Sequence, residues 1–445
     1  MKRKVSLSTT VTLILLSMAL TVSLTMLLSM RHFNNELQQV SDRQAEYEHI
    51  HNVDSIVRKY YPNLDEALLR EGISQGFIDG LGDPYAVYYN PNRYAVERLR
   101  MTGSAKDTGI TLAMDAEGRV VIGRVQSKSS AGKAGVKEGD VVEKVDGTPV
   151  AEIPLNELHA LMSAEKVLLT VQQEGETQAF TLNSVEYEVD SVQSATLGTI
   201  GYIRIYAFYD NTPAQFRTAL ATLQEQGVTG LIFDLRNNAG GSQKAVQEVL
   251  DSIMPLGTYG RMTDVRGKET MLSTAVSNQV NVSTATLINS GTAGEAEFFA
   301  GVLQEASLTT AVGQTTAGKA KYQEYFALDA DNSGIKLTVG EFGLLKSGSW
   351  EGKGIQPVVP AELPPEQAGI FGLLKPEDDA QVKAAVDFIS KSDLPQMNEP
   401  EPPTTDGTTE GNGTTEPADS TTGEGDTTKG EDKTTEKTTE KTEKK

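Results

Sequence analysis

The chain has 445 residues, enough for two or three domains with hydrophobic cores of their own. Its formal net charge of −21 argues against a nucleic-acid partner, because phosphate binding requires a positive surface. It contains no cysteine, which excludes disulfides, thiolate zinc sites and a cysteine nucleophile. Its four histidines show no H-E-x-x-H spacing, so we expect neither a metal nor another cofactor.

The N-terminus combines positive charge with an apolar segment. Lys2, Arg3 and Lys4 precede an uncharged stretch, Val5 to Met30, which exceeds the roughly 20 residues needed to span a bilayer. A cleaved signal peptide is the competing interpretation, but the apolar run is longer than a usual signal core and no A-x-A site follows it. We therefore predict that residues 1–32 form a cytoplasmic tip and a signal anchor. The protein would then be a single-pass protein of the cell membrane with an extracytoplasmic body.

The next segment, residues 33–104, is polar and rich in helix-forming residues. Apolar residues recur at helical spacing between Leu64 and Ile78, and the breakers of Gly80 to Pro91 end this pattern. We predict an N-terminal helical cap or dimerisation segment at 33–104, with helices between Asn34 and Tyr60.

Residues 105–187 are typical of a compact, β-rich domain. Strand-like runs, Arg119 to Val125 and Val167 to Gln172, flank the phrase SSAGKAGVKEGDVVEKVDGTPV, which covers Ser129 to Val150. This phrase resembles the signature of PDZ domains. The resemblance implies a domain that binds the C-termini of peptides or proteins.

The loop that would bind such a C-terminus reads TGIT and consists of Thr108, Gly109, Ile110 and Thr111. It takes the place of the Gly-Leu-Gly or Gly-Ile-Gly loop of the family. Backbone N–H groups in that loop would hold the carboxylate while the strand edge pairs with the peptide backbone. Thr111 replaces the second glycine. The alternative is a PDZ fold used only as a lid or spacer.

From residue 188 to residue 394 the pattern alternates between strands and helices. Two apolar runs, Gly201 to Phe208 and Gly230 to Arg236, suit buried parallel strands. Two other segments, Thr212 to Gln226 and Gln243 to Met254, have helical periodicity. We predict an α/β domain at 188–394.

Four motifs of this domain resemble the carboxyl-terminal processing, or tail-specific, serine proteases. Leu287 to Gly301 (LINSGTAGEAEFFAG) resembles VNxGSASASEIxAG, whose middle serine is the nucleophile, and Val312 to Gln323 (VGQTTAGKAKYQ) resembles VGxxTFGKGTVQ, whose lysine is the base. Two further segments, RNNAGG at Arg236 to Gly241 and GKGIQPVV at Gly352 to Val359, also match. The resemblance implies a ClpP/crotonase-like protease core that binds extended or C-terminal segments of protein substrates.

The nucleophile position of this resemblance is occupied by a glycine. Glu297, followed by Ala300 and Gly301, matches the glutamate and the Ala-Gly pair of the family, and this register places Gly294 where the serine belongs. Glycine has no side chain and cannot form an acyl-enzyme, so catalysis should fall by several orders of magnitude. We therefore predict a catalytically impaired member of the family.

Other elements of the catalytic site remain in the sequence. The resemblance makes Lys319 the base, Gln323 its hydrogen-bonding partner, and the backbone of Gly240 and Gly241 the oxyanion hole. An apolar pocket would lower the pKa of the lysine, as a base requires. Glu295 is a further departure, and we expect its carboxylate to pair with the lysine and hold it charged.

Two alternatives remain open. The first is an active serine-type endopeptidase in which Thr292 or Ser290 supplies the hydroxyl. The second is a structural or regulatory scaffold that partners an active paralogue. We expect a homodimer or a hetero-oligomer with such a paralogue.

Two further features carry no ligand prediction. The segment that starts at Asp329 begins like a calcium loop, but Gly340 stands at its twelfth position, so we predict a hairpin turn at Asp331 to Gly334 instead.

Residues 395–445 are rich in Thr, Glu, Gly, Asp and Lys, and lack aromatic residues. We predict a disordered acidic tail that serves as a tether or only as a solubilising segment.

Overall fold

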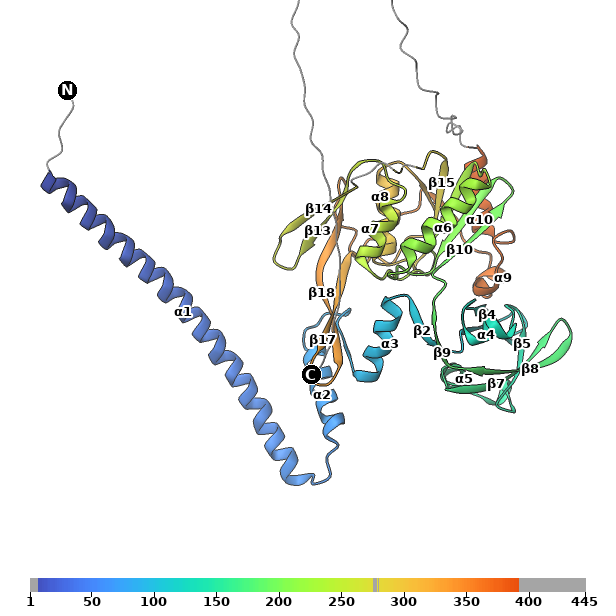
Figure 1. The fold of residues 1–445 in the computed structure, drawn as a ribbon, viewed down its shortest axis with the longest axis horizontal. Coiled ribbons are helices and arrows are strands. Elements are labelled where there is room, and N and C mark those ends of the chain that lie inside the picture. Colours follow the sequence, from blue (N-terminus) through green and yellow to red (C-terminus); the bar gives the residue numbers. More distant parts are fainter. Residues whose placement is uncertain (1–6, 275–277, 279, 392–445) are drawn as a thin grey trace, which may run out of the picture. The chain divides into compact units, whose positions relative to one another are not determined.

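The computed structural model describes residues 7–274, 278 and 280–391 (Figure 1). The first six residues of the predicted tip and anchor at residues 1–32, and the predicted tail at residues 395–445, lie outside this part of the chain.

The first element, α1 (Leu7–Tyr60), is one continuous helix of 54 residues. Its segment Thr12–Arg31 has a mean hydropathy of 2.2 and is long and apolar enough to cross a membrane. The helix does not end at residue 32, where we placed the boundary of the anchor. No glycine or proline interrupts the chain until Pro62, so nothing in the backbone chemistry stops the helix before Tyr60.

Short elements follow α1 and lead to the β-rich domain. Side chains of Asp65 and Asn90 cap the next two helices by accepting backbone N–H groups of the first turn. These elements are α2 (Glu66–Asp79), β1 (Val87–Tyr89) and α3 (Pro91–Met101).

The β-rich domain is bracketed by two paired strands, β2 (Ser104–Asp107) and β9 (Val185–Glu188). Between them a sheet has the order β3-β4-β5-β7-β8, with β6 paired to β5. Its elements are β3 (Ile110–Met114), β4 (Val120–Val125), α4 (Ser130–Ala134), β5 (Val141–Val145), β6 (Thr148–Pro149), η1 (Val150–Glu152), α5 (Leu155–Leu161), β7 (Lys166–Gln173) and β8 (Glu176–Asn183). Buried side chains from sheet and helices form its core, for example Ile122, Leu158 and Leu169.

The predicted α/β core is confirmed and contains a sheet in the order β10-β11-β12-β15-β16-β19. All neighbours pair in parallel except β10 and β11. The strands are β10 (Val192–Leu197), β11 (Ile200–Ile205), β12 (Gly230–Asp234), β15 (Ser283–Ile288), β16 (Thr310–Gly313) and β19 (Val359–Pro360). Every residue of β12 and β15 is buried, as expected for strands covered on both faces.

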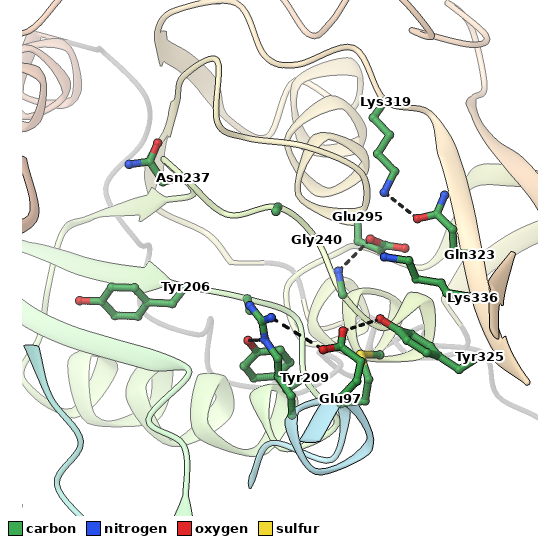
Figure 2. Close-up of a pocket in the computed structure, with 15 residues that line it drawn as sticks. Glu97, Tyr206, Tyr209, Asn237, Gly240, Glu295, Lys319, Gln323, Tyr325 and Lys336 are labelled. Carbon is green, nitrogen blue, oxygen red and sulfur yellow. Dashed lines mark hydrogen bonds and ion pairs between the residues drawn. The ribbon is translucent and has the colours of Figure 1, made fainter. Parts of the chain in front are cut away.

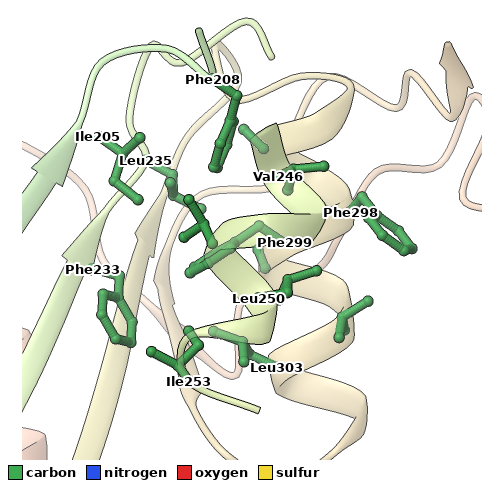
Figure 3. Packing of buried hydrophobic residues seen from close by; sticks show 14 of the residues in the cluster. Ile205, Phe208, Phe233, Leu235, Val246, Leu250, Ile253, Phe298, Phe299 and Leu303 are labelled. Carbon is green, nitrogen blue, oxygen red and sulfur yellow. The ribbon is translucent and has the colours of Figure 1, made fainter. Parts of the chain in front are cut away.

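Helices cover the two faces of this sheet. Successive side chains of a strand point to opposite faces, so Phe233 packs with the helices of one face while Ile232 packs with α10 on the other. Figure 3 shows the first face, where Phe233 and Phe299 meet edge to face with 5.7 Å between ring centroids. The helices are α6 (Thr212–Glu225), α7 (Gln243–Asp251), α8 (Glu295–Glu305) and α10 (Ala380–Lys391).

A second sheet has the order β1-β18-β13-β14, with β17 paired to β18. Its strands are β13 (Gly257–Asp264), β14 (Glu269–Thr274), β17 (Lys321–Leu328) and β18 (Ser333–Leu344). A hairpin forms where it was predicted, but its turn covers residues 329–332 instead of Asp331 to Gly334. Leu328 pairs with Ser333 across the connection, so Ser333 and Gly334 belong to β18. Two short helical turns, α9 (Pro365–Ala368) and η2 (Phe371–Leu373), precede α10.

Candidate active site

A cavity of about 220 Å³ brings together the loop after β12, the start of α8 and strands β17 and β18. Figure 2 shows Lys319, Gln323, Glu295 and Lys336 around this space. Among the described residues that line the cavity, none is a serine, threonine or cysteine. The site thus offers amines, carboxylates and tyrosines, but no hydroxyl or thiol of the usual nucleophiles.

Lys319 and Gln323 lie together in the cavity. The lysine Nζ donates a hydrogen bond of 2.6 Å to Gln323 Oε1 and lies 4.8 Å from the ring centroid of Tyr85. Burial lowers the pKa of Lys319, although nearby carboxylates, Glu295 foremost, act in the opposite direction. This environment therefore shifts the lysine towards its neutral form, which is the form that accepts a proton.

A second amine, which sequence reasoning missed, lines the same cavity. Lys336 lies on β18, and burial together with the positive charge of Lys319 lowers its pKa. Among the described residues its Nζ has no hydrogen-bond or ion-pair partner within reach, and it lies 5.9 Å from the ring centroid of Tyr325. A single lysine in an alternating strand gives no sequence signal.

Glu297 connects the start of α8 to the loop that carries Lys319. Its fully buried carboxylate accepts the N–H groups of Gly294, Gly318 and Lys319 at 3.0, 2.7 and 2.8 Å, and also the hydroxyl of Thr316. The sequence analysis used this residue only to fix the register. Its buried carboxylate is what holds the nucleophile position beside the loop of the lysine.

Gly294 is the N-cap of α8 and has φ 61° and ψ −123°. Residues with a side chain rarely adopt this conformation, so the glycine lets the chain turn sharply into the helix. Space is not the obstacle, because a Cβ built here would lie 3.6 Å from its nearest neighbour, the Ala239 carbonyl oxygen. The backbone thus leaves room for a side chain but would strain any residue other than glycine.

The predicted oxyanion hole differs in one of its two donors. The Gly240 N–H donates to Asn238 Oδ1 at 2.9 Å and is therefore already occupied within its own loop. The same asparagine donates from Nδ2 to the Ile205 carbonyl oxygen, which fixes its orientation. Of the two glycines, only Gly241 donates its N–H to α8, where the acceptor is the Glu295 carboxylate. The role predicted for Gly240 stays a prediction, and in this structure the Asn238 side chain folds back onto its N–H.

Glu295 does not pair with Lys319 as we predicted. Its Oε2 instead accepts the Gly241 N–H at 2.9 Å. The side chain is only 5% exposed. Burial raises the pKa of Glu295, and Lys319 opposes that shift only through space.

Neither hydroxyl of the alternative hypothesis reaches the lysine. Thr292 is buried, and its Oγ1 donates to the Leu235 carbonyl oxygen at 2.9 Å. Ser290 is exposed and is not among the residues that line the cavity. Both hydroxyls therefore lack contact with Lys319 in this structure.

A buried ion network positions the loop that carries Gly240 and Gly241. Arg236 contacts Asp234 at 2.6 Å and Asp379 at 2.8 Å, and all three side chains are at most 3% exposed. Burial alone would raise the pKa of Asp234, but Arg236 lowers it to about 2. The network thus ties the end of β12 to the residues that precede α10.

The opposite wall of the cavity comes from α3 and the segment after β11. Arg100 Nε donates to the Tyr209 hydroxyl oxygen at 2.9 Å. The Tyr325 hydroxyl donates to Glu97 Oε1 at 2.8 Å. These contacts close one side of the cavity with paired polar groups.

The first two residues of the predicted peptide-binding loop have N–H groups that donate to partners inside the domain. The Thr108 N–H donates to the Met162 carbonyl oxygen at 3.3 Å, and the Gly109 N–H donates to Asp107 Oδ1 at 2.6 Å. Ile110 and Thr111 begin β3, which lies at the end of its sheet. The outer edge of β3 is therefore open in the described part of the chain.

No cluster of three or more His, Cys, Asp or Glu side chains suited to a metal ion occurs among the described residues.

Comparisons with known proteins agree with these features. Residues 199–361 match peptidase family S41, and residues 121–173 match the PDZ domain. The carboxy-terminal processing protease CtpA of Bacillus subtilis (strain 168) is 31% identical over 319 residues, which are 70% of this chain and 68% of that protein. Its relative CtpB from the same organism is 28% identical over 322 residues, which are 69% of this chain and 66% of that protein.

A solved structure also shares the fold. The putative S41 protease from Bacteroides fragilis is 15% identical, has a TM-score of 0.54, and is matched over 76% of this chain and 96% of that chain. At this identity the likeness concerns the fold alone.

Proposed function

Because this chain belongs to peptidase family S41, the family of the carboxy-terminal processing serine proteases, we propose that it is a membrane-anchored, extracytoplasmic member that binds peptide segments and is catalytically impaired. The observation that carries the proposal is Gly294 at the start of α8, beside a Lys319–Gln323 pair that is still assembled. A base without a nucleophile cannot form the acyl-enzyme of the family.

Peptide binding is supported by two surfaces that do not need a nucleophile. The edge of β3 is available for an added strand, a mode in which backbone hydrogen bonds give affinity. The cavity also holds two partly buried amines, Lys319 and Lys336, which suit a ligand with a carboxylate or polar backbone. Both surfaces are features of binding rather than of chemistry.

The membrane location is supported by the amino-terminal helix. Thr12–Arg31 is long and apolar enough to cross a bilayer, and positive residues precede it in the sequence. The positive charges favour a cytoplasmic N-terminus, which puts the PDZ and protease domains on the other side.

The binding part of the proposal can be tested with the full-length chain in detergent. Three fluorescent versions of one unstructured peptide are compared by anisotropy: a free C-terminus, an amidated C-terminus, and a free C-terminus with N-methylated alternate amides. We expect the first to bind, while amidation and N-methylation each weaken binding at least about tenfold, equivalent to about 1.4 kcal/mol. Equal binding of all three peptides, or none, would contradict the proposed binding mode.

Orientation is tested separately. Protease added to the outside of intact cells should digest the PDZ and protease domains of the full-length chain. Complete protection of those domains, with digestion only after the cells are opened, would refute the extracytoplasmic assignment.

A further inference from the structure

The carboxylate of Glu295 lies on one of the two glycines that the sequence assigns to the oxyanion hole. Its Oε2 accepts the Gly241 N–H at 2.9 Å. Backbone N–H groups of a glycine-rich loop beside the start of a helix are donors of the kind that stabilise an oxyanion. Here the accepting oxygen belongs to the chain itself.

The surroundings show that the carboxylate fits this place closely. Glu295 is 5% exposed, and a Cβ added to Gly240 would overlap its Oε2. The φ angles of Gly240 and Gly241 are 97° and 149°, and a Cβ on Gly241 would overlap the Phe208 carbonyl oxygen. A glycine at position 240 therefore leaves room for the carboxylate, while a glycine at position 241 lets the loop pass close to the Phe208 carbonyl.

The carboxylate is held by a backbone donor and not by a counter-ion. Among the described residues no side chain donates to Glu295, and no Lys, Arg or His nitrogen lies within 4.0 Å of its carboxylate oxygens. Two cations, Lys319 and Lys336, act on it only from a greater distance, across the same cavity. Because a buried carboxylate without a hydrogen bond is costly, the Gly241 N–H compensates part of the cost of burying Glu295.

We propose that Glu295 fills the oxyanion hole of this chain with its own carboxylate, as an internal plug. The inference rests on the proposed function and deepens it, since catalysis would then be lost for two separate reasons. A bound peptide could lie in the cavity, but its carbonyl oxygen could not reach the Gly241 N–H. Restoring a serine at Gly294 alone would leave the second obstacle in place.

The first test compares two variants of the full-length chain in detergent, Gly294→Ser and Gly294→Ser with Glu295→Ala. Each is treated with a fluorophosphonate probe, in which the serine Oγ forms a bond to phosphorus and fluoride leaves. The phosphonyl oxygen needs the oxyanion hole, and one such donor is worth about a hundredfold to a thousandfold in rate. We therefore expect the double variant to be labelled at least about a hundred times faster than the single variant.

A matched control uses another acid of the same region. Glu324 lies exposed on β17, one residue after Gln323. Adding Glu324→Ala to Gly294→Ser should leave the labelling rate of the single variant unchanged. Equal labelling of Gly294→Ser and its Glu295→Ala derivative would overturn the plug.

The second test does not depend on restored chemistry. The backbone amide of Gly241 is followed by NMR in the natural chain, in Glu295→Gln and in Glu295→Ala. A carboxylate acceptor moves an amide proton downfield, so we expect its resonance to move upfield in both variants and to follow the titration of the carboxyl in the natural chain. A Gly241 resonance that is the same in the natural chain and in Glu295→Ala would overturn the proposal, even where neither serine variant is labelled.

These readouts are independent of peptide binding by the natural chain. If the natural chain binds no peptide but the double variant is labelled faster, the plug stands and the binding part of the proposed function fails. If peptides bind but the Gly241 amide resonance is unchanged by substitution of Glu295, the proposed function stands and the plug fails.

Discussion

The PDZ domain and the protease site both place an internal carboxylate on a backbone N–H where an external anion is expected. In the PDZ loop, Asp107 Oδ1 accepts the Gly109 N–H at 2.6 Å from two residues away in the sequence. In the protease site, Glu295 Oε2 accepts the Gly241 N–H at 2.9 Å from 54 residues away. The first contact is a local turn, whereas the second joins the loop after β12 to the start of α8.

The two carboxylates also differ in burial and in their side-chain hydrogen-bond donors. Asp107 is partly exposed and also accepts the Tyr187 hydroxyl at 2.7 Å. Glu295 is buried and has no side-chain donor among the described residues. We infer that the PDZ contact mainly shapes its own loop, while the protease contact depends on the tertiary structure that brings two distant segments together.

The largest effect is expected from removing the buried ion network that supports the loop of Gly241 in the protease site. Arg236→Ala would leave two buried carboxylates, Asp234 and Asp379, without their counter-ion. We expect a loss of about 3–5 kcal/mol in unfolding free energy of the protease domain, measured by urea denaturation. Lys244→Ala, which removes an exposed ion pair of the adjacent α7, should leave the denaturation midpoint unchanged. Similar effects of the two substitutions would contradict the role of the buried network.

A smaller effect is expected from the conformation at the nucleophile position. Gly294→Ser puts a side chain at φ 61° and ψ −123°, where there is space but also strain. The variant should be less stable than the natural chain by about 1–3 kcal/mol in thermal or urea unfolding. As a control, Gly72→Ser lies in α2 with no atom within 4 Å of the new Cβ and should not destabilise. An equally stable Gly294→Ser would show that the backbone relaxes there.

The buried carboxylate also predicts a dependence of stability on pH. Burial raises the pKa of Glu295, so above its ordinary value of 4.5 the folded chain retains a proton that the unfolded chain has released. The stability contributed by this group is complete below that pH and is lost as the pH rises through the raised pKa.

The pH dependence can be measured by comparing Glu295→Gln with the natural chain in urea unfolding between about pH 5 and about pH 8. The natural chain should lose stability relative to Glu295→Gln as the pH increases. Glu324→Gln, at an exposed position, provides the matched variant and should show no such trend. A constant difference between the natural chain and Glu295→Gln would disagree with a buried carboxyl of raised pKa.

The smallest effect should come from the local contact of the PDZ loop. Asp107→Asn keeps an oxygen acceptor for the Gly109 N–H but removes the negative charge beside the loop. We expect peptides with a free C-terminus to bind about threefold to tenfold more tightly, and amidated peptides to bind as before. Anisotropy titrations with both peptides provide the measurement. An equal change in affinity for the two peptides would show that the Asp107 charge does not act on the peptide carboxylate.

The parts of the fold that were predictable are those set by local patterns. The apolar run Gly230 to Arg236 appears as β12, and the periodic segment Thr212 to Gln226 appears as α6. Helix was predicted both in the anchor and between Asn34 and Tyr60, but not their fusion into one α1, because the polar residues between them carry no apolar pattern that marks a continuing helix. Long-range strand pairing in the second sheet, such as β13 with β18, leaves no comparable local signal.

The features of the site also divide into those that a short motif identifies and those that depend on the tertiary structure. Gly294, Lys319 and Gln323 lie in linear motifs, and their positions could be proposed from the sequence. The acceptor for the Gly240 N–H depends on how the Asn238 side chain turns, and the partner of Glu295 depends on tertiary packing. In the proposed plug these two hydrogen bonds occupy the oxyanion hole, and neither is encoded in a short motif.

The most direct test of the central claim is to ask whether the natural chain binds a peptide without cutting it. The full-length chain in detergent is incubated with an unstructured fluorescent peptide that has a free C-terminus, and binding and peptide mass are followed in the same sample. We predict a bound peptide of unchanged mass. Cleavage by the natural chain, abolished in Lys319→Ala, would show that another group acts as the nucleophile and would contradict the account.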